Sequence, residues 1–121
     1  MLTREEILAK DDQKLEEVKV PEWGGSVFVK TMDGPGRVGF EVAIVKRRPK
    51  PTETEEKPKH RYVMECMLAF SVCDADKNMM FQPDDIEKLA DKNGAALARI
   101  FKVAARLNPV FDDDIDEIEK N

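Results

Sequence analysis

The sequence is poor in the residues from which most catalytic sites are built. Among its 121 residues it has one histidine, His60, and two cysteines, Cys66 and Cys73. A metal site made of several histidines is therefore excluded, and neither cysteine has a spacing from His60 that suggests a catalytic pair. The sequence contains no Gly-x-Ser-x-Gly motif and no glycine-rich phosphate loop. We therefore expect a protein that is not an enzyme, with no catalytic residues and no cofactor.

Long apolar runs and an excess of positive charge are also missing. No apolar stretch approaches the ~20 residues that a membrane span requires. The N-terminus lacks the basic and then apolar order of a signal peptide. The formal net charge is −5, whereas binding to nucleic acid requires a basic face. The single basic cluster, KRRPK at residues 46–50, is better explained as a helix end that enters a linker. We therefore expect neither a membrane nor a nucleic acid as partner.

The composition predicts one small domain with a modest core and a strongly solvated surface. Hydrophobic residues make up 41% of the chain and charged residues 37%. The pattern predicts an α+β fold, with an N-terminal β-hairpin and a mostly α-helical remainder. We divide the chain into a helix–hairpin–helix portion (1–48), a flexible linker or loop with three prolines (49–59), a helical portion (60–109) and an acidic tail (110–121).

The N-terminal portion shows clear local signals. TREE at the start is a capping box, in which Thr3 and Glu6 exchange hydrogen bonds. It predicts a helix over residues 4–10 that is too short to stand alone and must dock on something. Alternating valines on either side of EWGG predict a β-hairpin over residues 15–32. Asp33 is the expected N-cap of the next helix.

The C-terminal portion is expected to be helical. Residues 59–71 predict a largely buried helix, although a strand remains an alternative toward its end. Cys66 and Cys73 are expected to be buried and reduced, because their spacing on a helix is too great for a disulfide. Two further helices are predicted, one that begins at Pro83 and one with the clean amphipathic pattern of Leu97, Ile100, Phe101, Ala104 and Leu107.

The segment CDADKNMMFQPDDIEKL, which starts at Cys73, partly matches the calcium loop of an EF-hand. Oxygen-bearing side chains stand at the first, third and fifth positions of the loop: Asp74, Asp76 and Asn78. Met79, however, replaces the glycine that the sharp turn requires, and Asp85 replaces the longer glutamate at the last position. Aspartate and asparagine also stabilise tight turns through their own side chains. We therefore favour a turn and predict no metal site.

Three stretches carry a resemblance to a known family. They are the opening MLTREEILAKDD, the hairpin VKVPEWGGSVFVKTMDGPGRVGFE and the segment CDADKNMMFQPDDIEKLADKNGAALARIFKVAARLN. Their most specific parts are VPEWGG, the D-x-D-x-N-x-x-F turn and ALARIFKVAARLN. In this order they resemble the tail assembly chaperones of long-tailed bacteriophages, of the type found in lambda-like and related siphophages.

The resemblance implies a non-catalytic role in building the phage tail. Such a chaperone binds the tape-measure protein, keeps this apolar, helical protein soluble and promotes assembly of the tail tube around it. A longer product of a programmed frameshift is expected to recruit the tail-tube protein. The resemblance also implies action in the host bacterial cytoplasm and absence from the mature virion. The alternative is a structural tail or connector protein that is retained in the virion.

Four apolar side chains are the candidates for contacting a partner: Trp23, Phe28, Met79 and Met80. A tryptophan beside a hairpin turn more often clamps the hairpin onto the core than it anchors an interface. Met79 and Met80 adjoin a polar turn, where flexible thioethers suit the binding of apolar helices. The open edge of the hairpin can pair with a copy of itself, so a homo-oligomer is a further expectation.

Overall fold

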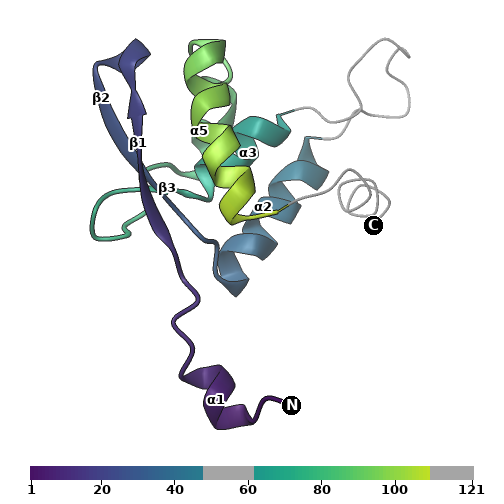
Figure 1. The fold of residues 1–121 in the computed structure, drawn as a ribbon. Coiled ribbons are helices and arrows are strands. Elements are labelled where there is room, and N and C mark those ends of the chain that lie inside the picture. The colour runs from purple at the N-terminus through teal and green to yellow at the C-terminus, as the bar shows by residue number, and fades with distance from the viewer. Residues whose placement is uncertain (48–61, 110–121) are drawn as a thin grey trace.

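The fold is a three-stranded antiparallel sheet with helices packed on one of its faces (Figure 1). The computed structural model describes residues 1–47 and 62–109. The predicted linker (49–59), the predicted acidic tail (110–121) and His60 therefore lie outside the described residues. The prediction of an α+β fold with an N-terminal hairpin is confirmed.

The hairpin consists of β1 (Leu15–Val20) and β2 (Gly25–Lys30), joined by the 3₁₀ turn η1 (Pro21–Trp23). Gly24 has a φ of 72°, a left-handed conformation that glycine adopts without strain. The register pairs Val18 with Val27, so the valines of both strands share one face. That face is covered by helices, and Val29 on it is fully buried.

A third strand, β3 (Val72–Cys73), pairs with the free side of β2. It directly follows α3 (Val63–Ala69), so the alternative of a strand at the end of this segment is confirmed. The predicted helix from residue 59 is too long, because Tyr62 lies in the left-handed region (φ 62°) immediately before the first turn. A left-handed residue cannot continue a right-handed helix.

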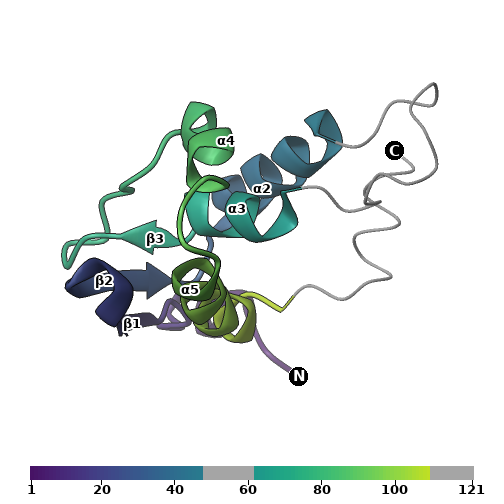
Figure 2. The same cartoon turned by 90° about the horizontal axis from the view of Figure 1, so that it is seen from above.

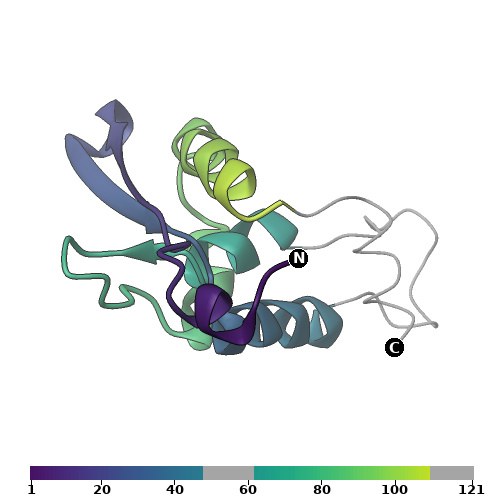
Figure 3. The same cartoon turned by 60° about the horizontal axis from the view of Figure 1, so that its bottom comes forward.

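The other helices of the core surround α3 on the covered face of the sheet, as the views in Figures 2 and 3 show. They are α2 (Gly34–Lys46), α4 (Ile86–Leu89), which continues the 3₁₀ turn η2 (Pro83–Asp85), and α5 (Gly94–Leu107). Asp33 caps α2, since its Oδ1 accepts from the Gly36 amide at 2.8 Å. The core joins residues from both halves of the chain; its largest fully buried side chains include Phe40, Ile44, Met67, Leu68, Ile86 and Ile100.

The side chain of Asn108, directly after α5, ties this helix to the end of β2. Its Oδ1 accepts from the Met32 amide at 2.6 Å, and its Nδ2 donates to the Lys30 carbonyl at 3.1 Å. Asn108 is 6% exposed. In such a place each unpaired polar group would cost about 1–3 kcal/mol. The residue that the sequence marked only as a helix end is thus a buried cross-link between distant segments.

The two cysteines are free and buried, as predicted. Burial raises the pKa of the Cys66 thiol to about 12. This thiol is therefore protonated at neutral pH and is a poor nucleophile.

The N-terminal helix α1 (Arg4–Leu8) forms with the predicted cap, in which the Thr3 hydroxyl accepts from the Glu6 amide at 3.2 Å. It does not dock on the described part of its own chain, because none of its residues is buried and Leu8 is 68% exposed. The expectation that it docks on something therefore stays a prediction. Figure 1 shows α1 projecting from the start of β1 as an arm. Within residues 1–47 and 62–109, no helix has the length and apolar character needed to cross a membrane.

Gly39 in α2 provides a test of the packing between α2 and the end of α3. A Cβ at position 39 would lie 2.5 Å from Cε1 of Phe70, closer than two carbons can approach. We expect Gly39→Ala to lower the free energy of unfolding by about 1–3 kcal/mol through overpacking, although alanine has a helix propensity ~1 kcal/mol better. Urea unfolding followed by circular dichroism measures the change.

The matched control is Gly94→Ala at the start of α5, where an added Cβ meets no atom within 4 Å. This variant should keep or slightly raise the stability. Equal stabilities for the two variants would contradict the close contact between Gly39 and Phe70.

Candidate partner-binding surface

The segment after β3 is a tight turn organised by the carboxylate of Asp74. Its Oδ1 accepts from the Asp76 amide at 2.8 Å and from the Asn78 amide at 3.0 Å. Its Oδ2 accepts from the Asn78 side-chain amide at 3.2 Å. Lys77 lies in the left-handed region with a φ of 68°. The segment that resembles a calcium loop therefore has the hydrogen bonds of a turn.

The same hydrogen bonds set the charge state of the turn. The backbone hydrogen bond from Asn78 is the main cause that lowers the pKa of the Asp74 carboxyl below its usual value. The ionised carboxylate thus directs both of its oxygens to donors within the turn. In the part of the chain that the structure describes, no three His, Cys, Asp or Glu side chains are grouped so as to hold a metal ion.

The turn brings the chain back to the sheet at Met79 and Met80. Met79 forms an antiparallel bridge with Cys73, and the Met80 amide donates to the Val72 carbonyl at 3.3 Å. Because successive side chains of an extended strand alternate, Met79 and Met80 point to opposite sides. Their exposed fractions are 39% and 48%, so both thioethers are open to solvent.

Met79 belongs to an apolar row on the face of the sheet opposite the core. Phe28 pairs with Cys73 and Cys73 pairs with Met79, and paired residues of antiparallel strands share a face. Cys73 is fully buried between half-buried Phe28 and the partly exposed Met79. The structure thus places two of the four candidate residues, Phe28 and Met79, in one continuous row.

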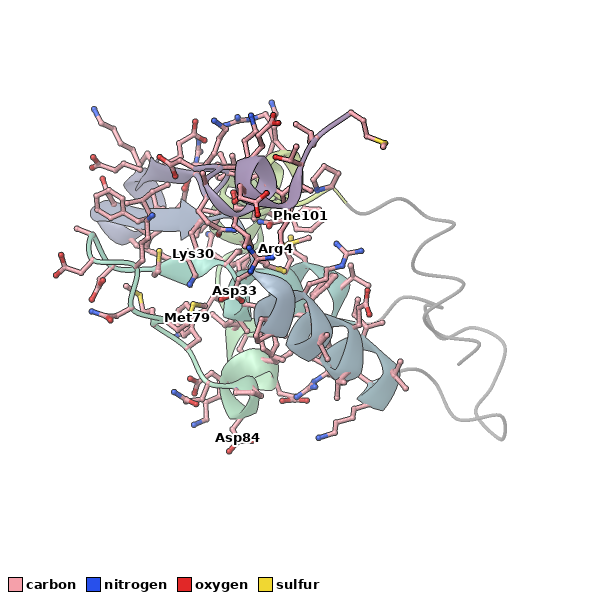
Figure 4. The ribbon with its side chains drawn as sticks, turned by 90° about the horizontal axis from the view of Figure 1, so that it is seen from below. Arg4, Lys30, Asp33, Met79, Asp84 and Phe101 are labelled. Carbon is pink, nitrogen blue, oxygen red and sulfur yellow. The ribbon has the colours of Figure 1, made fainter. Side chains whose placement is uncertain are left out.

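A groove of about 270 Å³, the Met79 groove, continues this row toward the start of α2. Its apolar lining comes from Met79, Phe70 and Met32, with Pro35 at its end. Lys30 provides a cation on the rim, and Figure 4 shows this side chain beside Met79 and Asp33. Asp33 also lines the groove, so its rim carries one charge of each sign. The groove can therefore bind an apolar side chain that has polar neighbours.

A second groove of about 350 Å³, the Met80 groove, lies between the turn and α4. Met80, Phe81 and Leu89 line its apolar part. Lys88 and Lys92 lie on its rim together with an aspartate, Asp85. Lys88 Nζ lies 3.8 Å from Asp85 Oδ1, whereas Lys92 has no ion-pair partner among the described residues. Each methionine thus lines a separate groove that has an apolar lining and charged residues on its rim.

Trp23 is not part of this surface. It lies at the tip of the hairpin, at the end of the sheet away from the turn after β3 (Figure 1). The interpretation of Trp23 as a clamp on the core is wrong, because its side chain is 40% exposed. An ion pair holds the hairpin tip in its place: Arg99 Nη2 of α5 lies 2.9 Å from Glu22 Oε2. This pairing is the main cause that lowers the pKa of the Glu22 carboxyl.

Sequence reasoning identified the two methionines but missed the residues that make their surroundings. Lys30, Phe70 and Leu89 are far from Met79 and Met80 in the sequence or belong to other elements. Their role depends on the pairing of β3 with β2, which no local pattern specifies. The sequence signal closest to these residues is Phe81, an apolar residue that follows the polar turn and is half-buried in the structure.

The charge of Asp74 gives a prediction for the turn that carries both methionines. Because the folded pKa lies below the ordinary value of 3.8, ionised Asp74 stabilises the turn fully above pH 3.8. This contribution is lost as the pH falls through the folded pKa. In NMR titrations the amide proton of Asn78, which has no titrating side chain of its own, should shift with a midpoint below pH 3.8. A midpoint at or above that value contradicts this geometry, and Asp74→Asn, which keeps an acceptor oxygen, should abolish the titration.

Comparisons with known proteins agree with this fold. The family model described as phage tail assembly chaperone matches residues 3–121. A solved structure, titled "Structure of bacteriophage HK97 tail assembly chaperone", superposes with a TM-score of 0.56 at 22% sequence identity. The match covers 78% of this chain and 85% of that chain, and at this identity it shows a shared fold. No curated protein matches the sequence. Because the family model spans nearly the whole sequence, the chain belongs to the phage tail assembly chaperone family.

Proposed function

We propose that this chaperone binds apolar helical segments of the phage tape-measure protein in the Met79 and Met80 grooves. The observation that carries the proposal is the exposed pair Met79–Met80, which a turn with many hydrogen bonds presents in two directions. Methionine is unbranched and polarisable, so it adapts to apolar surfaces of varied shape. A protein that must keep a long, varied client soluble requires this kind of adaptable surface.

The charges around the Met80 groove, two lysines and one aspartate, favour a helix with acidic flanks. Lys30 lies at the Met79 groove, and Lys88 and Lys92 lie at the Met80 groove. A helix in the Met80 groove would place its apolar stripe on Met80, Phe81 and Leu89 and its carboxylates near Lys88 and Lys92. Lys30 is half-buried, and Lys88 and Lys92 are exposed, so we expect them to affect the association rate more than the final affinity.

The protein is further proposed to act at an early stage of tail assembly and to associate with itself. We infer a non-catalytic role in the host bacterial cytoplasm, before the tail tube is complete, and absence from the mature virion. Recruitment of the tail-tube protein is assigned to a longer, frameshifted product of the same gene. A homo-oligomer is also proposed. It is supported by the open edge of β1 and by exposed apolar side chains near the N-terminus, which are Leu2 before α1 and Ile7 and Leu8 in α1.

Co-expression with the tape-measure protein of the same genome tests client binding. We expect the wild-type chain to keep that protein soluble and to co-purify with it. The double variant Met79→Glu with Met80→Glu should abolish this effect, because two carboxylates would be desolvated in apolar grooves. Solubility and pull-down of the tape-measure protein are the measurements.

The matched control is Val42→Glu, which places a charge on another exposed apolar side chain (47% exposed), on the outer side of α2. It should preserve client solubility, and both variants should retain the wild-type circular dichroism spectrum. A tape-measure protein that stays insoluble with the wild-type chain contradicts the proposal. Abundant peptides of this chain in purified virions would instead support the alternative, a structural tail or connector protein.

A further inference from the structure

A third groove, unrelated to the two methionines, runs along α5 beside β1. Its volume is about 660 Å³. Its apolar lining includes Val18, Ala98 and Val103, and its cationic lining consists of Arg99, Lys102 and Arg106. β1 is an edge strand of the sheet, as is β3 on the other side of β2, so the groove lies beside an edge of the sheet. We call it the α5 groove.

The α5 groove is positively charged within an acidic chain. α5 contains three cations and no acidic residue. Arg99 pairs with Glu22, and Arg106 pairs with Glu16, yet the two arginine side chains remain 48% and 60% exposed. A guanidinium has five N–H donors, so one carboxylate leaves donors free for another. Lys102 is exposed and has no ion-pair partner within residues 1–47 and 62–109.

The negative charge of the chain is concentrated in its last twelve residues. Of the 25 acidic and 20 basic residues, six acidic residues and one lysine belong to residues 110–121 (VFDDDIDEIEKN). Residues 1–109 therefore carry 19 residues of each sign and no net charge, so the whole formal charge of −5 comes from this segment. The segment also has Phe111, Ile115 and Ile118 at spacings of four and three, the sequence spacing typical of one face of an amphipathic helix.

We propose that residues 110–121 occupy the α5 groove of their own chain. The apolar stripe of the segment matches the apolar lining of the groove, and its carboxylates match Arg99, Lys102 and Arg106. An acidic segment with regularly spaced apolar side chains is complementary to the groove in both charge and apolar surface. The segment thereby covers a cationic, partly apolar surface that would otherwise attract other acidic proteins.

The position and length of the segment agree with this occupant. α5 ends at Leu107, and Asn108 (φ −130°, ψ 73°) and Pro109 interrupt the helix, so the chain can reverse there. The groove residues run from Ala95 to Arg106, about 17 Å along a helix, and twelve helical residues span about 18 Å. The short connection gives the segment an effective concentration in the millimolar range, which favours the groove of its own chain.

Paramagnetic relaxation enhancement on the full chain tests the proposal. A nitroxide is attached to Asn121→Cys, which removes no charge, while native Cys66 and Cys73 are buried. We expect the amide signals of Ala95 and Ala98 to lose most of their intensity and those of Val42 on α2 to keep it. At about 1 M salt, where the Debye length is about 3 Å, the signals should recover.

Two charge variants make the test specific. Lys102→Glu should restore the signals of Ala95 and Ala98, whereas Lys46→Glu, at the exposed end of α2, should leave the broadening unchanged. Absence of broadening in the wild-type chain, or equal broadening over all surfaces, overturns the proposal. Broadening in a mixture of isotope-labelled chains without nitroxide and unlabelled chains with nitroxide would place the segment on a second copy, which also overturns it.

Discussion

The buried side chain of Asn108 is the constraint that the rest of the structure depends on. It bonds to the Met32 amide, the Lys30 carbonyl and the Ala104 carbonyl, and thus joins the end of α5 to the junction between β2 and α2. Without this link, the buried Met32 amide and the Lys30 carbonyl would need other partners. The link fixes β2, and β2 in turn provides the pairing edge for β3.

This scaffold accounts for the surface around the methionines. β3 is only two residues long, so its position depends on β2 rather than on its own length. Once β3 is paired, the turn held by Asp74 returns Met79 to Cys73 and directs Met80 to the other side. A small fold that covers one face of its sheet thus leaves apolar side chains exposed without loss of its core. Exposed apolar side chains of this kind are candidates for an interaction surface, and we propose this role for Met79 and Met80.

The sequence predicted the features that depend on neighbouring residues. The cap at Thr3, the hairpin around Gly24 and the amphipathic α5 all follow from patterns a few residues long. It did not predict the exposure of Trp23 or the role of Asn108, because both depend on contacts across most of the chain. The methionine pair was found because apolar residues beside a polar turn are conspicuous. The grooves around it were not, since their walls come from separate elements.

Hydrogen–deuterium exchange of the chain, alone and in its complex with the tape-measure protein, tests the central claim most directly. The account predicts that complex formation slows exchange mainly over residues 72–92, which include the turn, Met79, Met80 and α4. Exchange around Trp23 and along the exposed side of α5 should change little. Slower exchange confined to the hairpin tip or to α5, with residues 72–92 unchanged, would contradict the assignment of this surface to the client.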